Sequence, residues 1–195
     1  MSPFPRQSDI VKALRLFTIA FLLYQNAFSQ DIEPRRWSPI PLGTHVLGAG
    51  YSYTSGDVFF DPLLQAEDVK IRAHSLAVSF VQPFKVRNKL ANISLFVPFS
   101  AADWSGLLSG EPAGVNRTGF ADPRIRASVL LAGPPAGNAL ELRQYRIDNP
   151  TSTTVGVSLA VTIPLGEYFE DKLLNLGGNR FVFRPQVGMI HYWGT

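Results

Sequence analysis

One stretch of the chain decides the fold: Arg117-Thr-Gly-Phe-Ala-Asp-Pro-Arg-Ile-Arg-Ala-Ser-Val-Leu-Leu-Ala-Gly133. A turn signal at 119–123 leads directly into residues whose character alternates, as expected where successive side chains of a strand point to opposite faces. One face carries Ile125, Ala127, Val129 and Leu131, and the other carries Arg124, Arg126, Ser128 and Leu130. The pattern predicts a strand and leaves open whether its apolar face meets a protein core or lipid.

The same alternation recurs along the chain between turn signals. Further strands are predicted at 44–54, 70–83, 91–100, 153–165 and 179–193. Between them we expect loops at 55–69, 102–118 and 166–178, a short turn at 85–89, and a helix at 138–146 capped by Asn138. The acidic loops at 55–69 and 166–178 are expected to be solvated, with binding of divalent cations or lipopolysaccharide as the alternative, and the loop at 102–118 is long and rich in glycine. Repeated alternating segments of about ten residues are the signature of a transmembrane β-barrel.

The composition of the strand faces favours lipid over water on the apolar side. In 91–100 and 153–165 the other face is mostly small or polar and almost uncharged, whereas a solvated face would usually carry Lys and Glu. We therefore predict an all-β fold, an antiparallel up-and-down transmembrane β-barrel over 44–195. Because about six strands are fewer than the eight of the smallest single-chain barrels, we expect this to be the N-terminal portion of a longer barrel. A soluble exported β-sheet domain that binds a ligand is the alternative.

The N-terminus has the pattern of a secretion signal over 1–29. Arg6, Lys12 and Arg15 precede an apolar run at 16–24, and Ala27-Phe-Ser29 supplies small residues for a signal peptidase. The apolar run is far shorter than the ~20 residues that a spanning helix needs. Residues 30–43 are rich in proline and are expected to form an extended lead-in, with Trp37 at an interface or capping the barrel floor.

Composition excludes several other classes of protein. The chain of 195 residues has no cysteine, so disulfides and thiolate metal sites are excluded. Its net charge of +3 is mild and no basic block predicts nucleic-acid binding. His45, His74 and His191 lie in separate segments, and no nucleophile-elbow motif is present, so we expect neither a metal, a cofactor nor an enzyme. An exported chain without a later long apolar run is either soluble or a β-barrel.

Five charged residues are the candidate lumen-lining set: Asp122, Arg124, Arg126, Arg180 and Arg184. Arg124 and Arg126 share one face of their predicted strand, and Arg180 and Arg184 share one face of the last. Inside a barrel they would form either a structural ion-pair network, with Asp122 and loop acids as partners, or a basic constriction for anionic solutes.

A set of motifs, in order along the chain, resembles a known family. The motifs are Pro41-Leu-Gly-Thr-His-Val-Leu-Gly-Ala-Gly-Tyr51, Gly56-Asp-Val-Phe-Phe-Asp-Pro62, Thr118-Gly-Phe-Ala-Asp-Pro-Arg-Ile-Arg126, Pro164-Leu-Gly-Glu-Tyr168 and Leu174-Asn-Leu-Gly-Gly-Asn-Arg-Phe-Val-Phe-Arg-Pro-Gln-Val-Gly188. Over 37–195 the chain is similar to the meta-pathway-of-phenol-degradation family, whose members are bacterial outer-membrane proteins often labelled transporters. The resemblance brings no catalytic motif with it.

The resemblance and the strand pattern together predict a function and a place. We expect an outer-membrane channel or transporter for small solutes, hydrophobic or aromatic ones among them. Its partners would be outer-membrane lipid and a small organic solute, and its oligomeric state stays open. A non-conducting structural or adhesion barrel is the alternative within the same fold class. Strand parity places loops 55–69, 102–118 and 166–178 outside the cell and the turn at 85–89 in the periplasm.

Overall fold

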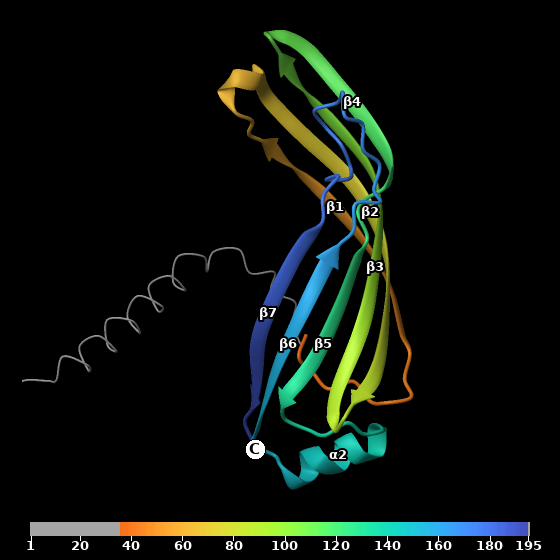
Figure 1. Cartoon of the computed structure of the whole chain (residues 1–195). Coiled ribbons are helices and arrows are strands. Elements are labelled where there is room, and N and C mark those ends of the chain that lie inside the picture. Colours follow the sequence, from red (N-terminus) through yellow and green to blue (C-terminus); the bar gives the residue numbers. More distant parts are fainter. Residues whose placement is uncertain (1–35, 195) are drawn as a thin grey trace, which may run out of the picture. The chain divides into compact units, whose positions relative to one another are not determined.

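The computed structural model describes residues 36–194 (Figure 1). The chain divides into two units, Met1–Arg36 and Trp37–Thr195, and the fold described below is that of the second. The predicted signal at 1–29 and the beginning of the predicted lead-in lie outside the described residues.

The second unit is an antiparallel sheet that curls into half a barrel (Figure 1). Its strands are β1 (Val46–Val58), β2 (Ala66–Val86), β3 (Lys89–Leu108), β4 (Glu111–Phe120), β5 (Arg124–Ala132), β6 (Ser152–Thr162) and β7 (Val182–Tyr192). The strands lie in the order β1-β2-β3-β5-β6-β7, and β4 pairs with β3. Every pairing is antiparallel. All pairs join strands that are neighbours along the chain, except β3 and β5, which are separated by β4. The prediction of an up-and-down antiparallel sheet is confirmed.

Strands β4 and β5 behave as one interrupted strand beside β3. Phe120 at the end of β4 pairs with Phe99, and Arg124 at the start of β5 pairs with Phe96. The interruption coincides with two prolines, Pro98 and Pro123, neither of which has an N–H to donate to the ladder. The sheet is therefore six strands wide, as the sequence predicts.

The predicted loop at 102–118 is wrong, because this segment is a long β-hairpin. Strand β3 runs on to Leu108, and β4 starts at Glu111. The turn is the pair Ser109-Gly110, with φ of 53° and 84°, which is what a two-residue type I′ hairpin turn requires. Gly106, by contrast, is a strand residue whose missing Cβ would lie 2.8 Å from the carbonyl oxygen of Glu67.

The predicted loop at 55–69 is likewise largely strand. Strand β1 continues to Val58, and β2 begins at Ala66 with a bulge between Glu67 and Lys70. Only a short connection remains, and it contains the 3-10 helix η1 (Pro62–Leu64).

The predicted helix is confirmed as α2 (Ala139–Asp148). Asn138 caps it, because its Oδ1 accepts hydrogen bonds from the backbone N–H groups of Leu140 and Glu141 at 2.9 and 3.1 Å. The helix lies at the end of the sheet that carries the β2–β3 turn (Figure 1), where Ala136 N–H donates to Asn88 O at 3.3 Å. None of the helices in the described part of the chain is long and apolar enough to cross a membrane.

The two faces of the sheet carry different side chains, as predicted. One face, here called the inner face, has small or polar residues that other segments cover, such as Thr154, Ser158 and Ala160 on β6. The opposite, outer face exposes large apolar side chains, with Leu159 45% and Val187 75% accessible. On β6 the strand pattern thus places the small and polar residues on the inner side of the curved sheet and the large apolar residues on the outer side.

Candidate functional site

At the end of the sheet that carries the β2–β3 turn and α2, here called the lower end, the inner face is closed by Trp37, which is 9% exposed. Its indole lies on Gly156 and Gly188, which face each other across β6 and β7. A Cβ built on either glycine would lie 2.1 Å from an indole atom, so neither position tolerates a side chain while Trp37 stays in place. Leu90 and Leu130 are buried in the same cluster. Trp37, Leu90, Leu130 and the two glycines are called the Trp37 floor below.

Three arginines of the candidate set, Arg124, Arg126 and Arg184, lie on the inner face of the sheet. Arg126 on β5 pairs with Ala160 on β6, and Ala160 pairs in turn with Arg184 on β7, so the three form one row across the sheet. Ala160 is 1% exposed and contributes only a methyl group to this row. Arg126 is 8% exposed, and Arg184 is exposed.

The other members of the set are placed differently from one another. Arg124 is half-buried, with its guanidinium 5.2 Å from the ring centroid of Phe96. None of Arg124, Arg126 and Arg184 is without an interaction partner. Strand β7 begins at Val182, so Arg180 lies in the exposed loop before it, and the prediction that Arg180 shares a strand face with Arg184 is wrong.

Asp122 binds backbone rather than a guanidinium in the described contacts. Its Oδ1 accepts the N–H of Gly166 at 2.8 Å, and its Oδ2 accepts the N–H of Gly178 at 2.7 Å. A Cβ on Gly166 would lie 2.7 Å from the backbone nitrogen of Asp122, so glycine is required for this approach. Asp122, Gly166 and Gly178 are called the Asp122 clasp. It joins three of the motifs that carry the family resemblance, although they are far apart in the sequence.

The clasp folds loop 166–178 against the sheet. Glu167 N–H donates to Phe120 O, and Gly177 N–H donates to Glu167 O, each at 2.9 Å. Arg117 on β4 donates from Nε to Leu174 O at 3.2 Å, and its guanidinium lies 5.2 Å from the ring centroid of Phe169. The acids of this loop are exposed as predicted, but Leu174 and Leu176 pack on a buried cluster of the inner face, so the loop is only partly solvated.

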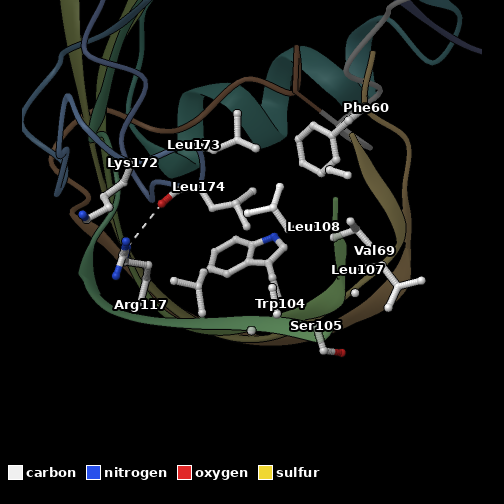
Figure 2. A pocket seen from close by; sticks show the side chains of 15 residues that line it. Phe60, Val69, Trp104, Ser105, Leu107, Leu108, Arg117, Lys172, Leu173 and Leu174 are labelled. Carbon is white, nitrogen blue, oxygen red and sulfur yellow. Dashed lines mark hydrogen bonds between the residues drawn. The ribbon is translucent and has the colours of Figure 1, made fainter. Parts of the chain in front are cut away.

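A pocket of about 220 Å³ lies between this loop and the upper inner face (Figure 2). Its walls are mostly apolar, with Trp104 of β3 among the lining residues Phe60, Val69, Leu108, Val115 and Leu174. Trp104 is itself 8% exposed and is buried with Val69, Ala73 and Ala102. Arg117 and Lys172 stand at one margin of the pocket (Figure 2).

The charged groups at this margin are engaged with the protein itself. Arg117 donates to the carbonyls of Leu174 and Asn116, and Lys172 forms an ion pair with Asp171. The ammonium of Lys172 lowers the pKa of the Asp171 carboxyl below its ordinary value. The sequence prediction missed this pocket, because it assigned Trp104 to a loop and had no indication that loop 166–178 folds inward.

The histidines are separate structural side chains. His74 accepts or donates a hydrogen bond with the Tyr51 hydroxyl at 2.7 Å and contacts Tyr53, and His191 pairs with the Thr153 hydroxyl at 2.8 Å. Among the described residues, no group of three His, Cys, Asp or Glu side chains is placed to hold a metal ion.

Comparisons with known proteins assign the chain to a family. Neither the curated proteins nor the solved structures include a match to this chain. A family model described as "Putative MetA-pathway of phenol degradation" matches residues 55–195, which is most of the chain, and the protein belongs to this family.

Proposed function

We propose that this chain forms part of the wall of a bacterial outer-membrane β-barrel that carries small solutes through its lumen. The observation that supports this most is the contrast between the two faces of the sheet. Exposed apolar residues follow the outer face from strand to strand: Leu47, Tyr51, Leu76, Val78, Ile93, Leu95, Ile125, Leu159, Val187 and Met189. Soluble monomers rarely expose a contiguous apolar surface of this extent, whereas the lipid-facing side of a barrel requires one.

The aromatic side chains support the same proposal. Phe99 and Phe120 are neighbours across β3 and β4 with ring centroids 5.2 Å apart, and Tyr51 lies in the same row of the sheet. Trp193, directly after β7, is 81% exposed. Aromatic rings at both ends of an apolar band match the interfacial girdles of outer-membrane barrels. The export signal predicted at 1–29 agrees with this location.

The proposal is for a solute pathway and not for an enzyme. The inner face offers a row of arginines, an apolar pocket and small residues, which are features of a passage. In the proposed orientation the Trp37 floor faces the periplasm and the Trp104 pocket faces the cell exterior, because a barrel chain that starts in the periplasm has its first hairpin outside.

A non-conducting barrel is the second candidate. It is favoured by one observation, that both ends of the inner face are covered by the chain itself, at the Trp37 floor and at loop 166–178. Conductance of the full-length protein in planar bilayers separates the two candidates. A passage gives single-channel steps, and a plugged barrel gives none.

The membrane assignment has its own test. Leu159→Arg places a charge on the outer face and should cost about 2–4 kcal/mol in the folded barrel if that face meets lipid near the midplane. The matched control is Ser52→Arg, because Ser52 is exposed on the inner face of β1. Equal destabilisation of the two variants in urea unfolding from lipid vesicles would refute the lipid-facing assignment, as would recovery of the protein in the soluble fraction without detergent.

A further inference from the structure

We infer that the Trp104 pocket is a binding site for a small, uncharged molecule with one aromatic ring. This site would lie on the solute pathway proposed above, and the inference rests on that proposal. The observations behind it are the size of the pocket, the chemistry of its walls and the contacts that Arg117 and Lys172 make at its margin.

The size of the pocket fits one ring. The pocket is a partly open cleft rather than an enclosed void. An apolar cavity of about 150 Å³ lined by Leu, Ile and Phe suffices to bind benzene. The pocket beside Trp104 measures about 220 Å³, which accommodates a ring with a small substituent.

The walls favour an apolar occupant over water. An ordered water needs two to four polar partners, while Phe60, Val69, Leu108, Val115 and Leu174 contribute only hydrocarbon side chains. Trp104 adds an aromatic surface, against which a second ring can stack or meet edge to face. The walls therefore select a ring rather than a polar metabolite.

The two cations at the margin of the pocket already have partners in the protein. Arg117 already donates to Leu174 O and Asn116 O and lies over Phe169, and Lys172 is paired with Asp171. These contacts use part of the hydrogen-bonding capacity of both cations, and Asp171 offsets the charge of Lys172. A carboxylate among the hydrocarbon walls would lose its hydration, which costs more than the burial of a hydroxyl group, so we expect the site to favour a phenol or a toluene over a benzoate.

The cover of the pocket is a segment anchored at both ends. The Asp122 clasp holds Gly166 and Gly178, and Leu173 and Leu174 between them line the pocket. The Arg117–Leu174 hydrogen bond is the contact that joins this middle part of the loop to β4. A solute can thus enter by displacing the middle of the loop while its two ends stay attached.

The test is binding of 4-fluorophenol to the full-length protein in detergent, followed by ¹⁹F NMR. This probe dissolves in water, and empty micelles measure its partition into detergent. We expect saturable broadening with the wild-type protein. Ala113→Phe fills the pocket from an exposed position of β4 and should weaken binding by about tenfold or more. Thr118→Phe, also exposed on β4 but on its outer face, should bind as the wild type does.

Each result decides the inference. Absence of saturable binding to the wild type, or equal binding by Ala113→Phe when that variant is shown to be folded by circular dichroism, would overturn it. Tighter binding of 4-fluorobenzoate than of 4-fluorophenol would overturn the assignment to an uncharged ligand. Conductance measured on the same preparation keeps the two proposals apart. A protein that conducts without binding refutes the pocket, and one that binds without conducting refutes the transport proposal.

Discussion

Trp37 and Trp104 are exposed to nearly the same extent, 9% and 8%, yet their surroundings differ. Trp37 lies so close to Gly156 and Gly188 that no Cβ fits between them. Trp104 borders a pocket of about 220 Å³. Two equally buried indoles can therefore serve different purposes: the first closes the lower inner face by close packing, and the second leaves room for another molecule. The following predictions test that distinction.

The largest effect is expected from removing each indole in turn. Trp→Ala in a packed core costs about 3–5 kcal/mol. Trp37→Ala should cost an amount at the upper end of this range, because the indole packs on Gly156 and Gly188 without a gap. Trp104→Ala should cost an amount at the lower end, because part of the indole surface faces the pocket. Urea unfolding from detergent or vesicles measures both. Equal losses in the free energy of unfolding would show that the two indoles are packed equally well, which contradicts the distinction drawn here.

A second prediction concerns the glycines of the floor. Gly188→Ala should destabilise the protein by about 1–3 kcal/mol, because the new methyl group meets the indole of Trp37. In a Trp37→Ala background the same substitution should be close to neutral. The double-mutant cycle therefore yields a coupling free energy of similar size. Additive effects would show that Gly188 is required for a reason other than Trp37.

The Asp122 clasp should control the loop over the Trp104 pocket. Hydrogen bonds to a charged group contribute about 1.5–3 kcal/mol each, so Asp122→Ala should speed amide exchange at Gly166 and Gly178 by about tenfold or more. Hydrogen-exchange mass spectrometry of residues 163–181 measures this. Asp171→Ala is the matched control, since its exposed carboxylate is paired only with neighbouring Lys172 among the described contacts. Unchanged exchange in Asp122→Ala would mean that the loop is held by its apolar contacts alone.

The smallest effect is expected between the two tryptophan regions, at the arginine row. Arg184→Glu reverses a charge on the inner face of β7 and should lower the anion-to-cation permeability ratio by about twofold to fivefold, which corresponds to less than about 1 kcal/mol. Arg180→Glu, in the loop before β7, should change the ratio less. Reversal potentials in a salt gradient measure both. Equal shifts would indicate a general charge effect rather than a constriction at the row.

The alternation of side chains was enough to predict much of the fold. It gave the antiparallel strands, the assignment of Gly156, Ser158 and Ala160 to the inner face, and the exposed apolar outer face. It also placed Arg126 and Arg184 on a common face. These features depend on local geometry, because each strand residue faces opposite to its neighbours whatever the rest of the chain does. The cap of α2 at Asn138 is local in the same sense.

Only the tertiary structure shows which role each glycine has and that loop 166–178 folds against the inner face. A glycine looks the same in a sequence whether it makes a turn, as Gly110 does, or lets another group approach closely, as Gly106 and Gly188 do. Loop 166–178 folds inward because the carboxylate of Asp122, 44 and 56 residues away in the sequence, accepts the N–H groups of Gly166 and Gly178. Such contacts join distant segments and leave no periodic trace in either one. The sequence could offer Trp37 as a cap of the barrel floor, but its contacts with Gly156 and Gly188, and the Trp104 pocket, depend on the curled sheet that brings these parts together.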